Sequence, residues 1–192
     1  MSAPSNPVCG GRRAILASGS PRRRELLAYV VPEFEIIPSG IEEIAAGSPA
    51  QQVETLAADK AADIAGRYPD AVVIGADTLV AVNDLVLGKP RDAAEAVSML
   101  KQLSECTHTV YTGVAVISAG KTHTAVESTQ VTFCRMTDDE IRDYIATGEP
   151  MDKAGAYGIQ GYGGKYITGI NGCFFNVMGL PLNRLYNMLK SI

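Results

Sequence analysis

Residues 71–77, with the sequence AVVIGAD, form a continuous apolar run that ends in a single acid. A strand with one face in water alternates apolar and polar residues, whereas an unbroken apolar run is typical of a strand buried on both faces. Such a strand requires a sheet that is covered on each side by other elements. The run therefore predicts an α/β protein with a buried central sheet, and it places Asp77 at the carboxyl end of its strand.

Helices to cover the sheet are predicted from capping signals along the chain. Serine followed by proline is a strong helix start, because serine caps the free N–H groups and proline fits the first turn. An aspartate before an apolar periodic stretch, or a threonine with glutamate three residues later, acts in the same way. The predicted helices start at Ser20-Pro21, at Ser48-Pro49 (through residue 68), at Asp92 (through about Leu103), at Thr137 with Glu140, and after Pro181.

The remaining chain is rich in strand and turn signals. Strands are expected at residues 14–18, 109–118 and 121–133, with a hairpin over 78–88 that turns at Asn83-Asp84. Residues 34–43 are expected to form a strand that runs into a loop. Eight glycines lie between Gly155 and Gly179 and include a predicted hairpin turn at Asn171-Gly172. Within that stretch, tyrosine and glutamine spaced among glycines over 154–164 suit a binding loop better than a merely flexible segment.

Charge and cysteine content exclude several classes of protein. The net charge of -4 disfavours a general nucleic-acid binder, although a small anionic ligand remains compatible with it. Four cysteines without a CxxC pair, together with two histidines, indicate neither a zinc site nor a disulfide framework. No apolar run approaches the roughly 18 residues of a membrane span. Residues 1–13 lack the apolar core of a signal peptide and are predicted to be a flexible lead-in. The spacing of the cysteines leads us to expect a reduced, cytoplasmic setting.

Three arginines, Arg22 to Arg24, occupy the first turn of the helix that starts at residue 21, where the helix dipole disfavours cations. At about 100° per residue, Arg23 projects near the middle of the apolar face of Leu26 and Leu27. Arg22 lies at the edge of that face, and Arg24 points mostly away. An arginine pair beside free N–H groups at the end of a strand favours a phosphate chain as the counter-charge. A solvated arginine run is the alternative, and it is the favoured one for Arg24.

Lys60 and Asp77 are charged residues in apolar surroundings. Lys60 lies near the centre of the apolar stripe of its predicted helix, so its ammonium either extends to solvent or reaches a buried anion. Asp77 ends a buried strand, a position suited to metal binding or general-base catalysis. An Asx turn or a cap for the next loop is the structural alternative for Asp77.

A polyphosphate and a divalent cation would together account for the unusual charges. Glu43, at the end of the strand over 34–43, would add a second carboxylate to Asp77, although alone it is more often one of a solvated pair with Glu42. Lys89 alone is an ordinary turn lysine. Mg²⁺ binds through one or two carboxylates plus substrate phosphates. The chain contains neither a P-loop nor a GxGxxG fingerprint. The cations assigned to the polyphosphate are Arg22, Arg23, Lys60 and Lys89.

Several longer motifs carry a resemblance to a known family. LASGSPRRRELL (16–27), IGADTLV (74–80), LGKPRD (87–92), GEPMDKAGAYGIQG (148–161) and NVMGLPL (176–182) stand in the order and spacing of the Maf family of nucleotide pyrophosphatases. The resemblance runs from Ala14 to the C-terminus, so we expect one domain over 14–192. It implies an elongated α/β fold with a central mixed sheet and flanking helices, similar to inosine triphosphate pyrophosphatases. It also implies two lobes around a substrate cleft, and a homodimer.

The resemblance further implies an activity and a set of site residues. The family hydrolyses nucleoside triphosphates to the monophosphate and pyrophosphate with a divalent metal, Mg²⁺ or Mn²⁺. Asp77 matches the family's proton acceptor, which would either deprotonate the attacking water or bind the metal. The positions that match phosphate and metal contacts are Ser18, Arg23, Glu43, Lys60 and Lys89.

Three further positions resemble one branch of the family. Arg22, Thr78 and Gln160 match the specificity positions of dTTP/UTP pyrophosphatases. The choice agrees with chemistry, because uracil and thymine present an N3–H donor beside carbonyl acceptors, and a glutamine amide offers both an acceptor and a donor. Two alternatives stay open: a pyrophosphatase for 7-methyl-GTP or another non-standard nucleotide, and a nucleotide-binding regulator of cell division.

Overall fold

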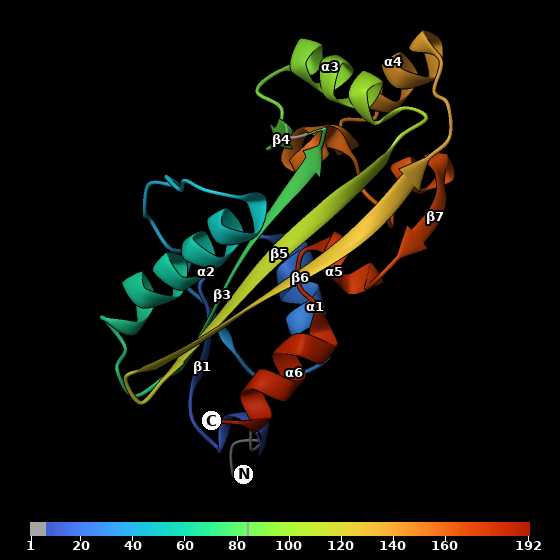
Figure 1. Cartoon of the computed structure of the whole chain (residues 1–192). Helices are drawn as coiled ribbons and strands as arrows, with labels where there is room; N and C mark the ends of the chain where they lie inside the picture. The colour runs from blue at the N-terminus through green and yellow to red at the C-terminus, as the bar shows by residue number, and fades with distance from the viewer. Residues whose placement is uncertain (1–6, 84) are drawn as a thin grey trace. The chain divides into compact units, whose positions relative to one another are not determined.

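A computed structural model describes residues 7–83 and 85–192, and its strands join into one mixed sheet (Figure 1). The strands are β1 (Ala14–Leu16), β2 (Glu35–Ile36), β3 (Val72–Val82), β4 (Leu85–Leu87), β5 (Thr107–Ser118), β6 (Lys121–Phe133) and β7 (Ile167–Asn171). Their order is β2-β1-β3-β5-β6-β7, with β4 paired to β3. β1 is parallel to β2 and β3, whereas β4 and β7 are antiparallel to their partners. The predicted α/β class with a mixed central sheet is confirmed.

Five helices begin where the sequence predicts them, whereas α5, which follows β7, is not predicted. The helices are α1 (Pro21–Leu27), α2 (Pro49–Ala65), α3 (Ala93–Leu103), α4 (Asp138–Ala146), α5 (Phe174–Met178) and α6 (Leu182–Lys190). Short 3-10 helices are η1 (Pro7–Cys9), η2 (Glu149–Asp152), η3 (Ala154–Ala156) and η4 (Tyr162–Tyr166). The side chains of all four predicted caps accept a backbone N–H of the first turn: Ser20, Ser48, Asp92 and Thr137.

The described chain divides into two compact units. The first contains the residues up to Asp77, Thr112–Glu127 and Gly179–Ile192, and the second contains Thr78–Tyr111 and Ser128–Met178. Of the lead-in expected over 1–13, residues 1–6 lie outside the described residues, while Cys9 in η1 is fully buried. A single domain over 14–192 stays a prediction.

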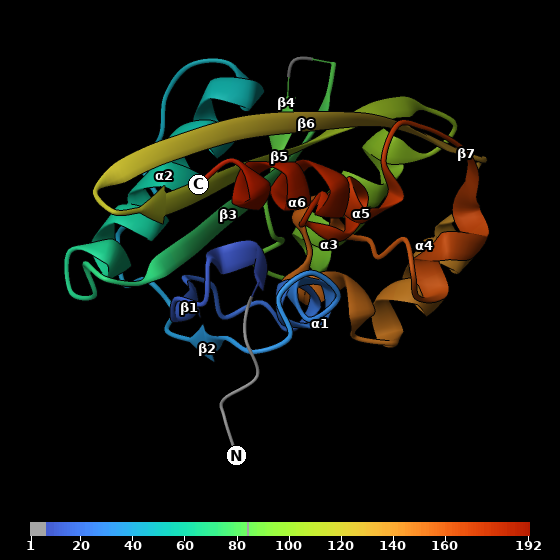
Figure 2. The same ribbon diagram turned by 90° about the horizontal axis from the view of Figure 1, so that it is seen from below.

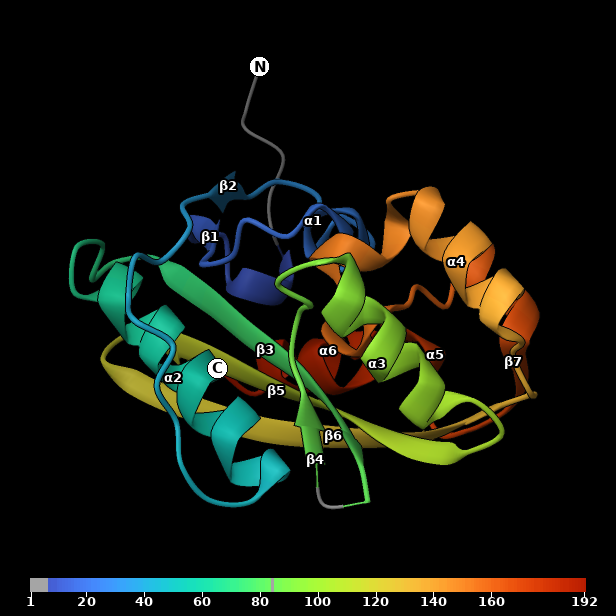
Figure 3. The ribbon, with the colours of Figure 1, turned by 90° about the horizontal axis from the view of Figure 1, so that it is seen from above.

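In the first unit, helices cover both faces of the sheet. Figures 2 and 3 show α1 and α6 on the face opposite α2. α2 approaches the backbone of β3 and β5 at two glycines. A Cβ on Gly75 would meet Ala61 at 3.0 Å and overlap a carbonyl of α2, and one on Gly113 would meet Glu54 N at 2.8 Å. The absence of side chains at Gly75 and Gly113 thus lets α2 lie directly on the sheet, with Lys60 on its buried face.

In the second unit, α3 and α4 pack against each other, as Figure 1 shows at its upper end. The hydrophobic core beneath them includes Leu100, Leu103 and Phe133, together with the buried tyrosines Tyr144 and Tyr157. This core carries the glycine-rich stretch that follows α4.

Two turn predictions have different outcomes. The hairpin between β3 and β4 forms, and its turn residue Asn83 has a left-handed φ of 47°, while Asp84 lies outside the described residues. The hairpin turn predicted at Asn171-Gly172 is wrong. β7 ends at Asn171, and the N–H of Cys173 donates to Thr129 Oγ1 at 3.0 Å as the chain enters α5. Gly172 is used instead for a strand-to-helix turn at φ 131°.

His108 on β5 is a buried histidine held neutral by its surroundings. Its Nε2 lies 2.8 Å from the Tyr157 hydroxyl, and its ring packs edge-on against Phe133 and Tyr157. The Nδ1 atom has no hydrogen-bond partner among the described residues. Burial lowers the pKa of His108 from 6.5 to about 4.

Acidification should therefore destabilise the fold through His108. Between pH 6.5 and about 4 the unfolded chain binds a proton at this residue that the native chain does not, so the free energy of unfolding falls as pH falls. The loss should reach about 3 kcal/mol near pH 4 and then level off. Urea unfolding at several pH values tests this, with His108→Leu as the variant that lacks the effect and His123→Gln as the control that keeps it. Parallel pH curves for wild type and His108→Leu would contradict the prediction.

Candidate functional site

Lys60 is the centre of a small ion cluster in the first unit. Its Nζ lies 2.6 Å from Asp77 Oδ1 and 2.7 Å from Glu43 Oε1. Lys60 and Asp77 are only 8% and 6% exposed, whereas the Glu43 side chain is 61% exposed. The ammonium thus reaches a buried anion and does not extend to solvent, which decides between the two predictions for Lys60. The cluster is open to solvent at its Glu43 end.

Asp77 lies in the middle of β3, not at its end as predicted. β3 continues to Val82 because residues 78–82 extend into the hairpin with β4. The neighbouring β1, however, ends at Leu16, which is level with Ile74. Asp77 therefore lies beyond the last residue pair of β1, and its side chain points to the face of the sheet that α2 covers, where Lys60 meets it.

Glu43 also sits differently from the prediction. β2 comprises only Glu35 and Ile36, and Glu43 lies in the long loop between β2 and α2. Pro38 and Gly40 follow β2 closely and favour loop conformations over a longer strand. Glu43 nonetheless reaches the cluster, because the loop brings its carboxylate to the Lys60 ammonium.

Arg23 and Ser18 adjoin the cluster from the segment after β1. The Arg23 guanidinium donates from Nε to the Gly179 carbonyl at 2.9 Å and from Nη1 to Ser18 Oγ at 3.2 Å. Burial lowers the pKa of Arg23, and the charges of Asp77 and Glu43 raise it. Arginine keeps its charge in proteins, so the guanidinium is a fixed cation beside the two carboxylates. We call Arg23, Glu43, Lys60 and Asp77, with Ser18, the ion cluster.

The other two arginines of the run differ in exposure. Arg24 is exposed, as predicted from the helical periodicity, and Arg22 is half-buried at the start of α1. Arg22 also lowers the pKa of Arg23, which indicates that the two guanidinium groups lie close enough to repel. An anion bound beside Arg22 and Arg23 would reduce the repulsion between the two guanidinium groups.

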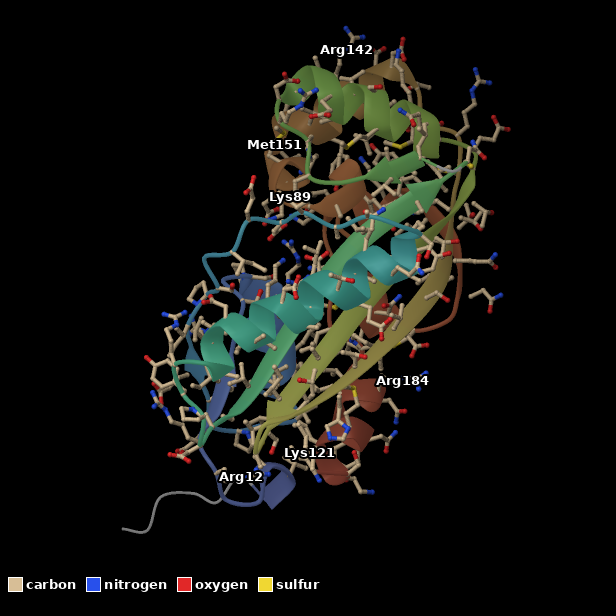
Figure 4. All side chains as sticks on the ribbon, turned by 60° about the vertical axis from the view of Figure 1, so that its left-hand side comes forward. Arg12, Lys89, Lys121, Arg142, Met151 and Arg184 are labelled. Carbon is tan, nitrogen blue, oxygen red and sulfur yellow. The ribbon has the colours of Figure 1, made fainter. Side chains whose placement is uncertain are left out.

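Three predicted residues belong to the second unit. Thr78 directly follows Asp77 on β3 and is half-buried. Lys89 is exposed on the loop between β4 and α3 (Figure 4). Gln160 is exposed in the turn between η3 and η4. The loops of Lys89 and Gln160 are tied together, because the N–H of Gly155 donates to the carbonyl of Gly88 at 3.0 Å.

Sequence reasoning missed Glu149, which organises the turn that carries Gln160. Its carboxylate accepts the N–H groups of Tyr162 and Gly163 at 2.8 and 3.1 Å and the Tyr144 hydroxyl at 2.7 Å. Burial raises the pKa of Glu149, but these hydrogen bonds outweigh burial and hold it below its ordinary value. An acid next to a glycine-rich stretch was the available signal, since free N–H groups of such turns seek an acceptor.

The donor set limits which ligands the cluster suits. No group of three or more His, Cys, Asp or Glu side chains that could hold a metal occurs in residues 7–83 and 85–192. The protein itself would supply two carboxylates, Glu43 and Asp77, which both contact the Lys60 ammonium. Mg²⁺ typically binds through one or two carboxylates when substrate phosphates provide further ligands. Within the same ranges, none of the helices has the length and apolar character needed to cross a membrane.

Comparison with known proteins adds a family assignment to this geometry. The family model described as "Maf-like protein" matches residues 13–192. A dTTP/UTP pyrophosphatase from Pelotomaculum thermopropionicum is 52% identical over 183 residues, covering 93% of this chain and 96% of that protein. A dTTP/UTP pyrophosphatase from Clostridium beijerinckii is 48% identical over 186 residues, covering 94% and 99%. The crystal structure of protein VC0702 from Vibrio cholerae covers 71% of this chain at 15% identity, with a TM-score of 0.38.

Proposed function

The chain belongs to the Maf family, and we propose that it hydrolyses dTTP and UTP to the monophosphate and pyrophosphate. The relatives that carry the name dTTP/UTP pyrophosphatase match nearly the whole chain at about half identity. The observation that carries the proposal is the buried contact of Lys60 with Asp77, beside the anchored guanidinium of Arg23. Fixed cations next to a buried carboxylate suit the attack of water on a polyphosphate.

Arg23, Lys60 and Lys89 are proposed to hold the phosphates, with Ser18 as a neutral contact. Arg23 is already oriented, because the Gly179 carbonyl and the Ser18 hydroxyl fix its guanidinium. An oriented cation stabilises developing charge without reorganising during the reaction. These cations would favour departure of pyrophosphate, which carries the negative charge of the leaving group.

Asp77 is proposed to accept the proton of the attacking water. The water oxygen bonds to the α-phosphorus while the bond from that phosphorus to the bridging oxygen breaks, and pyrophosphate leaves. Glu43 and Asp77 fit a divalent cation, Mg²⁺ or Mn²⁺, since both carboxylates already converge on one ammonium. When bound, the metal would neutralise charge on the phosphates. Asp77 would in that case serve as a metal ligand, as a base, or as both.

The base of the nucleotide is assigned to Gln160 with Arg22 and Thr78. This assignment rests on the resemblance to the dTTP/UTP branch and on the amide of Gln160, which can accept the N3–H and donate to a carbonyl of uracil or thymine. Gln160 is exposed and therefore accessible to a ligand.

A substrate panel tests the proposed function. Wild-type protein is incubated with dTTP, UTP, CTP, dATP, GTP and 7-methyl-GTP in Mg²⁺ or Mn²⁺, and released pyrophosphate is measured. We expect kcat/KM to be highest for dTTP and UTP. A preference for 7-methyl-GTP or another purine would contradict the choice of base. Nucleotide binding without turnover on any triphosphate would contradict the enzyme and point to a regulator.

The proposed cellular location is the cytoplasm, and the proposed assembly is a homodimer. A cytoplasmic location is supported by four free cysteines, since reducing conditions keep thiols unpaired. A homodimer is proposed from the family resemblance, and sedimentation equilibrium of the purified chain tests it.

Binding of a triphosphate should stabilise the fold through Arg23 and not through Arg24. A non-hydrolysable dTTP analogue with Mg²⁺ at about 100 times its Kd should add about 2.7 kcal/mol of stability to the wild type. For a chain of this size this raises Tm by about 5–10 °C. Differential scanning fluorimetry should show the rise at least halved in Arg23→Ala and unchanged in Arg24→Ala, the matched control on the same helix. An equal loss in both variants would mean that Arg23 has no special place in binding.

A further inference from the structure

Tyr144 and Glu149 form a continuous hydrogen-bonded chain around the turn that carries Gln160. The N–H of Gly158 donates to the Tyr144 hydroxyl oxygen at 3.0 Å, and this hydroxyl donates to Glu149 Oε1 at 2.7 Å. The same Oε1 accepts the N–H of Gly163 at 3.1 Å, and Oε2 accepts the N–H of Tyr162 at 2.8 Å. We call these two side chains the Tyr144–Glu149 pair.

The pair is enclosed so tightly by the turn that it requires glycine at several positions. A Cβ on Gly161 would overlap the Glu149 carboxylate, and one on Gly163 would lie 2.5 Å from the Tyr144 hydroxyl oxygen. A Cβ on Gly158 would lie 3.0 Å from Glu149 Oε1. Glycine at these positions therefore leaves room for the Tyr144 hydroxyl and the Glu149 carboxylate inside the turn.

The elements that carry the pair are themselves fixed in the second unit. Tyr144 of α4 is only 2% exposed and belongs to the core cluster. Glu149 is the first residue of η2, and Met151 of the same short helix packs against the same core (Figure 4). The Lys153 ammonium binds the Glu149 carbonyl at 2.6 Å. The core and the Lys153 contact thus hold the backbone segments that carry the pair.

The residues before Gln160 are anchored a second time. Tyr157 is buried, and its hydroxyl meets His108 Nε2 at 2.8 Å. Ile159, next to Gln160, is 9% exposed, whereas Gln160 itself is exposed. The backbone is held at position 158 on one side of Gln160 and at position 162 on the other. Because the backbone is held on both sides of Gln160, its exposed side chain extends from a fixed point of the turn.

We propose that the Tyr144–Glu149 pair is a positioning device that sets base selection by holding Gln160 at a fixed distance from the pyrimidine. This inference rests on the proposed function, in which Gln160 reads the edge of uracil or thymine. The pair contacts backbone groups of the turn and does not contact the nucleotide. Its loss should therefore change discrimination between bases and leave the chemical step alone.

The test compares UTP with CTP, which are of equal size and differ in the hydrogen-bonding edge of the base. Glu149→Gln puts an amide donor among N–H donors, and Tyr144→Phe removes the hydroxyl that links Gly158 to the carboxylate. Each should lower the UTP/CTP ratio of kcat/KM by about tenfold, through KM for UTP, with kcat at saturating UTP within about twofold of the wild type. Asp143→Asn, on the exposed side of α4, and Tyr29→Phe are the matched controls and should keep the wild-type ratio.

A double-mutant cycle separates positioning from general loosening. In a Gln160→Ala background, adding Glu149→Gln should leave the UTP/CTP ratio unchanged, because the residue that it positions is gone. Hydrogen exchange at residues 158–163 should be faster in Glu149→Gln than in wild type or Asp143→Asn. A wild-type ratio in Glu149→Gln, or an equal fall of the ratio in both backgrounds, would overturn the inference. Failure of the proposed function shows separately, as a wild-type protein that does not hydrolyse UTP or does not prefer it to CTP.

Discussion

Asp77→Asn is expected to lower kcat for pyrophosphate release from dTTP by about 10³-fold. The amide has nearly the shape of the carboxylate but cannot accept the proton of the attacking water, and it is a poor ligand for Mg²⁺. Folding should survive, since Lys60 keeps its contact with Glu43 at 2.7 Å. Steady-state kinetics at saturating dTTP and a thermal unfolding curve on the same preparation measure both quantities.

The same variant distinguishes the two roles proposed for Asp77. If Asp77 acts only as the base, the Mg²⁺ concentration for half-maximal residual activity should match the wild type, and if it ligates the metal, that concentration should rise. Asp59→Asn is the control, because Asp59 is exposed on α2 next to Lys60 and undergoes the same chemical change. A kcat of Asp77→Asn within about threefold of the wild type would remove Asp77 from the mechanism.

Lys60→Met is expected to cost both activity and stability. Methionine suits the apolar stripe of α2, so packing is kept, but Asp77 then stays buried without its ammonium. Removing one partner of a buried ion pair typically costs about 3–5 kcal/mol. Turnover should fall by about 10²-fold or more, because a phosphate contact is lost as well. Urea unfolding and pyrophosphate release measure the two effects.

Two comparisons make the Lys60 prediction specific. Lys101→Met removes an exposed ammonium that lies 2.9 Å from Asp138 and should change the free energy of unfolding by no more than about 1 kcal/mol. Adding Asp77→Asn to Lys60→Met should restore much of the lost stability, because the second change removes the buried carboxylate whose ammonium partner is gone. A Lys60→Met protein as stable as the wild type would show that the buried pair contributes nothing to the fold.

Local signals predicted the helices well. Each predicted cap is formed by the named side chain, and the stripe predicted on the helix over 48–68 is the buried face of α2, with Lys60 in it. Such features depend on residues three or four apart, and a sequence contains that information directly. For the same reason the contrast between Arg23 and Arg24 could be predicted from helical geometry alone.

The ends of strands could not be predicted in this way. The sequence predicts Asp77 at the end of its strand and Glu43 at the end of another, yet Asp77 is central in β3 and Glu43 is in a loop. Where a strand ends depends on its partners: β1 stops at Leu16, while β3 continues because β4 pairs with it. Likewise, Asn171-Gly172 has the composition of a hairpin turn. The N–H of Cys173, however, donates to the Thr129 hydroxyl, and the chain continues into α5.

Glu149 was missed for a different reason. Its function depends on contacts 13 and 14 residues ahead in the chain, with the N–H groups of Tyr162 and Gly163. No helical or strand period connects such positions. Only the folded turn shows that the glycines and the acid belong to one arrangement.

The direct contact of α2 with the sheet has a consequence for engineering this enzyme. Replacing glycine in a strand with alanine is a common way to gain stability, because alanine restricts the unfolded chain. At Gly75 and Gly113 the added methyl group would instead push α2 outward, since its backbone already occupies the space. Because Lys60 is part of α2, the same displacement would move its ammonium away from Asp77. Stability screens that ignore turnover should therefore leave these two positions unmodified, and libraries aimed at a new substrate should keep them as glycine.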